Sequence, residues 1–287
     1  MNAQSITVGD FQLTSVSGGT LWIDGGNMFG VIPKVMWEKA CPPDSKNRIL
    51  LDTNCLLIRT PDSLGLIDTG YGDKAGESFR ARHDLAAESQ LPRNLAAMGV
   101  SPDDIDWVIL THLHFDHAGG CTGRDADGRL RPTFPTARHV VQKVEWEDAT
   151  SNKPELAGAY FSNDFLPLAE AGLVELVDED AEVVPGVSVR RTNGHTRGHQ
   201  IVMLASGGHT ACYLGDLCPL TPHLRTFWSM SYDQFPLTVR TSKPVVLSGI
   251  ADGGQVAIFG HDPKCRFARI RRDDRGHSEW LLEPIVT

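Results

Sequence analysis

The sequence lacks any long hydrophobic run, and no stretch of its 287 residues approaches the roughly 18 apolar residues that a membrane span requires. Its first ten residues contain neither the basic segment nor the apolar segment of a signal peptide. No two of its six cysteines form a CxxC pair, which is typical of reduced thiols rather than of a disulfide framework. We therefore expect a cytoplasmic protein without a membrane partner.

The sequence also has few positive charges, because it contains 27 lysines and arginines and 36 acidic residues, which gives a formal net charge of -9. Proteins that bind a phosphate backbone usually show the opposite balance, so nucleic acid is not an expected partner. The hydrophobic fraction of 41% is ample for a core. The chain contains no internal repeat and no low-complexity linker. We therefore expect residues 1–287 to form a single domain.

One short segment near the middle of the chain is dense in metal ligands. Three imidazoles and one carboxylate fall within six residues: His112, His114, Asp116 and His117. The apolar, β-branched run 107–111 precedes them, which predicts a buried strand that ends in a ligand-bearing turn. Since side chains alternate along an extended chain, His112 and His114 are expected to point to the same side. A chance cluster of core histidines is the alternative, and this density of imidazole and carboxylate ligands argues for a metal site.

Three further segments repeat one pattern, in which an apolar run is followed by a turn with a glycine and a potential metal ligand. The ligands are His195 after the run 187–191, Asp216 after the run 211–214, and His261 after the run 255–259. Side chains at strand ends are held by a rigid scaffold, which a metal site requires. Each of these residues alone would be unremarkable, but together with the histidine segment they predict one site.

The order of predicted elements favours a layered α/β architecture, in which two sheets pack face to face and helices cover their outer faces. Residues 54–58 and 65–68 are expected to form a hairpin, and 266–282 an edge hairpin. A helix is expected over 84–98, with Pro92 as a kink or restart. A second helix is expected over 237–250, interrupted by Pro244.

These motifs resemble, in type and order, the motif series of the metallo-β-lactamase superfamily. The motifs are His112-x-His114-x-Asp116-His117, Gly194-His195-Thr196-x-Gly198-His199, Gly215-Asp216, Gly260-His261 and the early Ile67-Asp68-Thr69-Gly70. The resemblance implies an αββα four-layer sandwich of two mixed sheets flanked by helices, with the site at the sheet edges. It also implies two sets of ligands: His112, His114 and His195 for a first metal, Asp116, His117 and His261 for a second, and Asp216 as the bridge.

Two divalent ions bridged by a carboxylate can share a hydroxide that acts as nucleophile near neutral pH. In keeping with this, the chain has no Gly-x-Ser-x-Gly nucleophile motif. Zinc is the metal expected first, with manganese, cobalt or iron as alternatives. We expect Asp116 to relay a proton to the leaving oxygen and Asp68 either to orient a ligand histidine or to cap a turn. We expect His199 to support the site through hydrogen bonds, with a ligand role as the alternative.

Within the superfamily the site most resembles that of the small-molecule lactonases, esterases and organophosphate hydrolases. The expected reaction is attack of the shared hydroxide on a lactone, carboxylic ester or phosphotriester. The acyl-homoserine lactonases have a tyrosine where this chain has Pro219, which argues against homoserine lactones. A glyoxalase-II-like thioester hydrolase is an alternative, although only 26 residues follow His261. An iron-dependent oxidoreductase with thiol, persulfide or O₂ chemistry is the alternative from another class.

Candidates for the pocket that holds a small-molecule substrate are Phe115, His223 and Trp228, with core packing or an ordinary loop position as the alternative for each. The C-terminal region is basic, and its arginines would attract an acidic substrate or face a partner subunit in a homodimer. These are Arg266, Arg269, Arg271, Arg272 and Arg275.

Overall fold

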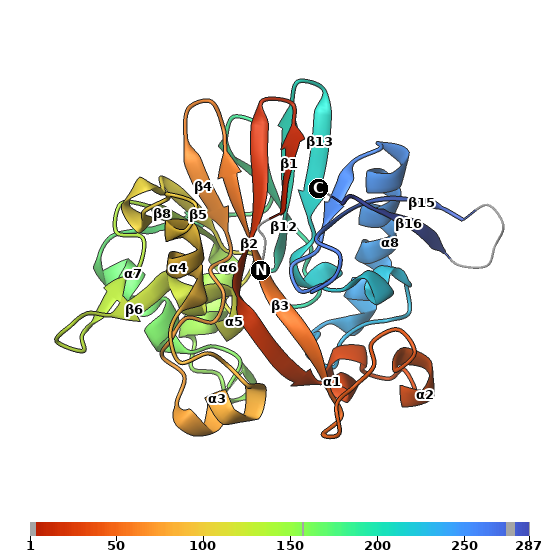
Figure 1. The fold of residues 1–287 in the computed structure, drawn as a ribbon, viewed down its shortest axis with the longest axis horizontal. Coiled ribbons are helices and arrows are strands. Elements are labelled where there is room, and N and C mark those ends of the chain that lie inside the picture. Colours follow the sequence, from red (N-terminus) through yellow and green to blue (C-terminus); the bar gives the residue numbers. More distant parts are fainter. Residues whose placement is uncertain (1–3, 157, 274–278, 287) are drawn as a thin grey trace.

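The computed structural model describes residues 4–156, 158–273 and 279–286, which contain two seven-stranded sheets and a two-stranded hairpin (Figure 1). The first sheet has the order β1-β2-β3-β4-β5-β8-β9. Its strands are β1 (Gln4–Val8), β2 (Phe11–Asp24), β3 (Arg48–Arg59), β4 (Leu64–Ile67), β5 (Trp107–Ile109), β8 (Arg138–Gln142) and β9 (Val174–Val177). The hairpin consists of β6 (Thr122–Arg124) and β7 (Leu130–Pro132).

The second sheet follows the chain order from β10 to β16. Its strands are β10 (Ala181–Val184), β11 (Val187–Arg191), β12 (Gln200–Ser206), β13 (His209–Tyr213), β14 (Val256–Ile258), β15 (Phe267–Arg272) and β16 (Trp280–Pro284). Both sheets are mixed, because β4, β5, β8 and β9 pair in parallel in the first and β13 pairs in parallel with β14 in the second. Crossovers between parallel strands require long connections, and these carry most of the helices.

Some of the helices cover the outer faces of the two sheets, and others lie in the loops at one end of the sheets. They are α1 (Gly25–Phe29), α2 (Lys34–Trp37), α3 (Glu77–His83), α4 (Gln90–Ala96), α5 (Phe115–Ala118), α6 (Lys143–Thr150), α7 (Leu166–Glu170) and α8 (Pro236–Asp252). In Figure 1, α4, α6 and α7 lie on one side of the sheets and α8 on the other. None of the described helices is long and apolar enough to cross a membrane.

Three buried clusters hold the layers together, which confirms the predicted αββα sandwich. The central cluster lies between the sheets and contains Ile109 from the first and Val202 from the second. A second cluster packs Leu95 of α4 against the first sheet. A third packs Leu247 of α8 against Cys212 of the second sheet. Burial of each fully buried aliphatic side chain contributes roughly 1.5–3 kcal/mol to the free energy of folding, so these clusters stabilise the packing of the layers.

The hairpin predicted from 54–58 and 65–68 is confirmed, because β3 and β4 pair antiparallel. The edge hairpin predicted over 266–282 is confirmed in its paired strands, because β15 pairs antiparallel with β16 at the edge of the second sheet. Arg275, one of the basic residues of this region, lies outside the described residues.

Two helix predictions were wrong in their extent. Helix α3 ends at His83, and Asp84 adopts a left-handed conformation with φ 53°, so the predicted helix begins only at Gln90 as α4. Pro92 then lies in the first turn, where a backbone N–H has no partner within the helix. Helix α8 runs without interruption through Pro244. Burial of its apolar face against the second sheet offsets the roughly 3 kcal/mol that an interior proline costs.

Candidate metal centre

The predicted ligands gather at one edge of the two sheets, in the loops that follow parallel strands. Two residues separate each ligand from the end of its strand: His112 follows β5, Asp216 follows β13, and His261 follows β14. Because parallel strands end at the same edge of a sheet, their C-terminal loops come together there. His195 reaches the same place from the loop between β11 and β12. The fold therefore assembles donors that lie up to about 150 positions apart in the chain.

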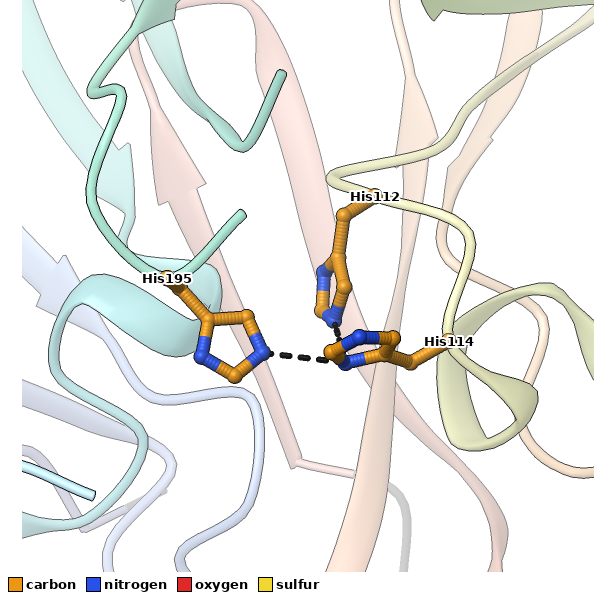
Figure 2. Close-up of side chains that lie close together, drawn as sticks. All are labelled: His112, His114 and His195. Carbon is orange, nitrogen blue, oxygen red and sulfur yellow. Dashed lines mark hydrogen bonds between the residues drawn. The ribbon is translucent and has the colours of Figure 1, made fainter. Parts of the chain in front are cut away.

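The first group of donors consists of His112, His114 and His195 (Figure 2). Nδ1 of His114 lies 2.9 Å from Nε2 of His112 and 3.0 Å from Nε2 of His195. Four ligands at a zinc–nitrogen distance of 2.0–2.1 Å stand about 3.3 Å apart in a tetrahedron. The three nitrogens are thus grouped closely enough to share one metal ion.

The second group consists of Asp116, His117 and His261. The Nε2 atoms of His117 and His261 lie 3.0 Å apart, and Oδ2 of Asp116 lies 3.6 Å from Nε2 of His261. Asp216 stands between the two groups. Its Oδ1 lies 3.2 Å from Nε2 of His261, and its Oδ2 lies 3.3 Å from Nε2 of His195. One carboxylate oxygen therefore faces each group.

Hydrogen bonds behind the histidines determine which ring nitrogen faces the centre. The pairs are His117 Nδ1 with Oδ2 of Asp68 at 2.8 Å, His195 Nδ1 with Oδ1 of Asp233 at 3.0 Å, and His261 Nδ1 with the carbonyl oxygen of Asp52 at 2.9 Å. Each of these oxygens only accepts hydrogen bonds, so each Nδ1 carries the hydrogen. With the hydrogen fixed on Nδ1, Nε2 is the atom of each ring that faces the centre and can bind a metal there.

This arrangement fits a cation. The Nε2 atoms of His117 and His261 face one another at 3.0 Å, a distance that requires a positive charge between them, either a proton or a metal ion. Oδ1 of Asp216 is buried and accepts no hydrogen bond from the described residues. Nitrogen and carboxylate donors of this kind suit zinc and other first-row divalent ions. The donor set therefore could hold divalent metal ions.

The histidines of the cluster differ in the direction in which their surroundings shift the pKa. Burial lowers the pKa of His112 and His114 well below 6.5, which keeps both rings neutral. Burial also opposes charge on His117, but the carboxylates of Asp216 and Asp68 outweigh it and hold the pKa of His117 well above 6.5. Although burial opposes the ionisation of Asp216, the imidazoles around it hold its pKa well below 3.8. Asp216 is therefore a carboxylate donor.

The carboxylate of Asp68 contacts one predicted ligand and one neighbouring strand end. One carboxylate oxygen contacts His117, and the other accepts the backbone N–H of Thr111 at 2.8 Å. The hydroxyl of Thr111 donates to the same carboxylate at 2.9 Å. Asp68 thereby orients a predicted ligand and ties the end of β4 to the end of β5.

His199 lies beneath the cluster. Its Nε2 accepts the backbone N–H of Asp216 at 2.9 Å, and its Nδ1 lies 2.7 Å from the hydroxyl of Thr192. Burial lowers the pKa of His199 to about 3, so the ring is neutral and Nε2 accepts. With both nitrogens engaged in this way, His199 positions the backbone of Asp216.

Two supporting acids were not predicted from the sequence, Asp233 and Glu145. The buried carboxylate of Glu145 accepts the backbone N–H of Leu113 at 3.0 Å, the hydroxyl of Thr196 at 2.6 Å and the N–H of Gly198 at 3.2 Å. It therefore ties the loop of His112 to the loop of His195. Neither acid stands in a recognisable motif, so no local signal was available to find them.

A cavity of about 320 Å³ opens onto the cluster. Asp116, Asp216 and His261 line its side at the donor cluster, and the pocket candidate Phe115 lines its wall. The apolar part of the wall includes Ile23, Met28, Leu51, Phe79 and Met230. Its size and lining are those of a small-molecule site.

The other two pocket candidates do not line this cavity. His223 is buried, donates from Nε2 to the carbonyl oxygen of Met28 at 2.7 Å and stacks on Phe29 with ring centroids 4.9 Å apart. Trp228 contacts the same phenylalanine edge-on at 5.5 Å. Both rings therefore pack behind the cavity wall, where their aromatic contacts with Phe29 hold them in place.

Comparison with known sequences gives one family model, described as "Metallo-beta-lactamase superfamily", which matches residues 48–273. An N-acyl homoserine lactonase from Bacillus cereus is 30% identical over 168 residues, covering 55% of this chain and 60% of that protein. The N-acyl homoserine lactonase AiiB from Agrobacterium fabrum is 37% identical over 175 residues, covering 55% of this chain and 59% of that protein. The chain thus aligns with about 60% of the length of these curated relatives.

Solved structures share the fold over nearly the whole chain. A probable metal-dependent hydrolase from Staphylococcus aureus superimposes with a TM-score of 0.87 at 29% identity, covering 98% of this chain and 100% of the other. The dizinc quorum-quenching lactonase AidC superimposes with a TM-score of 0.79 at 22% identity, covering 100% of this chain and 99% of the other. At that identity the second match concerns the fold alone.

Proposed function

The chain belongs to the metallo-beta-lactamase superfamily, and from this premise we propose that it is a dinuclear metal-dependent hydrolase of small-molecule lactones or esters. The observation that carries the proposal is the convergence of imidazole nitrogens around Asp216, whose two oxygens face separate donor groups. The relatives named as lactonases support a lactone as the first substrate class to test. Phosphotriesters are the second substrate class to test, and only the resemblance of the motifs supports them.

We assign the donors to two metals according to these groups. His112, His114 and His195 would hold the first ion, Asp116, His117 and His261 would hold the second, and Asp216 would lie between them with one oxygen toward each group. Two zinc ions, when bound, supply a Lewis acid and a hydroxide nucleophile at neutral pH. Asp68, Asp233 and the carbonyl of Asp52 keep three of the imidazoles in the tautomer that the metals require.

Asp116 is the proposed proton carrier. Its carboxylate lies 3.6 Å from Nε2 of His261 and also lines the cavity, so one residue reaches both the donor group and the substrate. A carboxylate in that position can accept a proton from the nucleophile and deliver it to the leaving oxygen. The ligands come from both sheets, which supports the proposal that residues 1–287 act as a single domain.

Metal analysis combined with a substrate panel tests the proposal. Protein reconstituted with zinc, manganese, cobalt or iron is assayed with lactones, aryl esters, thioesters and phosphotriesters. We expect two ions per chain and ester or lactone hydrolysis that Asp216→Asn abolishes. The control is Asp252→Asn, which changes an exposed carboxylate 3.4 Å from Arg272 and should keep full activity.

Two results would overturn this function. A single iron per chain, with oxygen consumption on a thiol substrate, would establish the oxidoreductase instead. A strong preference for thioesters over lactones and oxygen esters would establish the glyoxalase-II-like reaction.

A further inference from the structure

One histidine on the cavity wall has only one of its two ring nitrogens engaged by the described residues. His83, at the end of α3, is partly buried and lines the cavity. Its Nδ1 lies 3.1 Å from the carbonyl oxygen of Trp22 in β2. Since a carbonyl oxygen only accepts hydrogen bonds, Nδ1 carries the hydrogen of the neutral ring. Nε2 makes no hydrogen bond or ion pair with any residue that the structure describes.

The edge of β2 fixes the place of this ring. β1 pairs with β2 only from Phe11 to Ser15, so Trp22 lies where that edge has no neighbouring strand among the described residues. His83 occupies this edge through its Nδ1. The opposite side of the ring, which carries Nε2, is therefore turned away from the strand.

Two phenylalanines hold the ring against the cavity. The ring centroid of His83 lies 4.4 Å from that of Phe79 and 6.1 Å from that of Phe115. Both phenylalanines line the cavity. Phe115 directly precedes Asp116, the proposed proton carrier, so His83 lies on the side of the cavity next to the donor cluster. A substrate group that reaches His83 is therefore on the same side of the cavity as the reacting carbonyl.

The neutral ring of His83 offers a lone pair at Nε2. Burial lowers the pKa of His83 below 6.5, although the hydrogen bond to Trp22 opposes this shift, so the ring is uncharged at pH 7.5. A ligand that fills the apolar cavity displaces water from Nε2. An acceptor buried without a donor costs free energy, and a donor on the ligand removes that cost. The site therefore distinguishes ligands that carry such a donor from those that lack it.

We propose that His83 is a specificity-determining residue whose Nε2 accepts a hydrogen bond from an N–H or O–H group of the substrate. This inference rests on the proposed hydrolase function and narrows its substrate class. The substrates are lactones or esters that carry an amide N–H or a hydroxyl near the reacting carbonyl. His83 binds and orients the substrate and exchanges no proton with it.

Matched substrates test this role. Ethyl esters of 3-hydroxyoctanoic acid and of N-hexanoylglycine are compared with their O-methyl and N-methyl counterparts, which lack the donor. The ratio of kcat/KM for the donor-bearing ester to that for its methylated counterpart should be about three- to tenfold lower in His83→Phe than in wild type, for at least one pair. The pair that responds shows whether the donor is a hydroxyl or an amide.

Two further variants sharpen the comparison. His83→Gln keeps an acceptor on the side chain and should retain more of the ratio than His83→Phe. The matched control is His209→Phe, the same substitution at an exposed histidine at the start of β13, the end opposite to Asp216, and it should leave the ratio unchanged. A ratio that is equal in wild type and His83→Phe for both pairs would overturn the role of His83, even if the variant lowers all rates by disturbing the wall.

Binding of the free acids separates this proposal from the hydrolase function. Calorimetry with 3-hydroxyoctanoate, N-hexanoylglycine and their methylated counterparts on the metal-loaded protein requires no turnover. Tighter binding of either donor-bearing acid, lost in His83→Phe, would support the role of His83 even if no ester were hydrolysed, in which case only the hydrolase function would fail. Equal binding of donor-bearing and methylated acids by the wild-type protein would overturn the role of His83 regardless of activity.

Discussion

Nδ1 of His195 lies 3.0 Å from Oδ1 of Asp233, a residue 38 positions further along the chain. The other oxygen of Asp233 accepts the backbone N–H of Met230 at 2.9 Å. Asp233 is almost fully buried, so its carboxylate is held in place by these two contacts. Asp233 thus orients His195 although it lies outside β11 and β12, the two strands that flank the loop of His195.

The variant Asp233→Ala should weaken metal binding at the first group of donors. Without the carboxylate the ring of His195 loses the partner that fixes its tautomer and orientation, and such losses typically cost tenfold to a hundredfold in affinity. Competitive zinc titration of the purified variant measures the effect. Asp252→Asn serves as the matched control, and an affinity for both ions equal to that of wild type would contradict the role given to Asp233.

Replacing Glu145 should destabilise the fold more than replacing its neighbour on the same helix. Glu145→Ala leaves the backbone N–H groups of Leu113 and Gly198 buried without their acceptor, and each such loss costs about 1–3 kcal/mol. Glu147→Ala removes a half-exposed carboxylate 3.4 Å from Arg197 and should cost less than about 1 kcal/mol. Urea unfolding of the metal-free variants gives both free energies, and comparable values for the two would refute the linking role of Glu145.

Gly215 precedes the proposed bridging residue and has φ +49°, a conformation that disfavours other residues. A Cβ there would lie 2.7 Å from Nε2 of His199, the atom that accepts the N–H of Asp216. Gly215→Ala should therefore displace His199 and lower metal affinity as well as stability. Gly254→Ala is the control, because Gly254 has φ +59° but no heavy atom within 4 Å of the added Cβ.

We expect Gly254→Ala to cost about 1 kcal/mol of unfolding free energy through backbone strain alone and to leave metal affinity unchanged. Zinc titration and thermal unfolding of both variants separate the steric effect from the strain. Equal metal affinities in the two variants would rule out the steric effect at His199.

His139, which is not one of the proposed metal ligands, should make the stability of the protein depend on pH. Burial in β8 lowers the pKa of His139 to about 4, whereas the unfolded chain retains a value near 6.5. Between these values the unfolded chain binds more protons, so stability is complete above about pH 6.5 and is lost as the pH falls toward 4.

The variant His139→Leu cannot bind that proton and should lack this part of the pH dependence. The difference in unfolding free energy between wild type and variant should change by roughly 2 kcal/mol between pH 7.5 and pH 5, in favour of the variant at the lower pH. Urea titrations at both pH values measure this difference, in which the other titrating groups cancel. A difference that does not vary with pH would show that His139 is not the group responsible.

Most of the strands and the candidate ligands could be predicted from sequence because their signals are local. An apolar run of four or five residues, a glycine and a ligand-type side chain occupy fewer than ten consecutive positions, as at 211–216 and 255–261. The histidine segment at 112–117 follows the same logic. Strand periodicity and the exit of parallel strands at one edge then bring these segments together without further information.

Local signals misled where tertiary packing outweighs them. Pro244 was expected to interrupt a helix, but α8 buries Val239, Leu247 and Ile250 and passes through it. The predicted start of a helix at Asp84 was wrong because that residue adopts a left-handed conformation after α3. Apolar spacing over 84–98 does not reveal this break.

The sequence by itself determined the layered α/β class, the succession of most strands along the chain and the segments that carry imidazole and carboxylate donors, since each depends on neighbours within one strand or turn. Only the tertiary structure decided that Asp233 and Glu145 support the donors and that His223 and Trp228 pack behind the cavity. The physical reason is that these contacts join segments tens to hundreds of residues apart, and their closeness depends on how two sheets and their loops pack together.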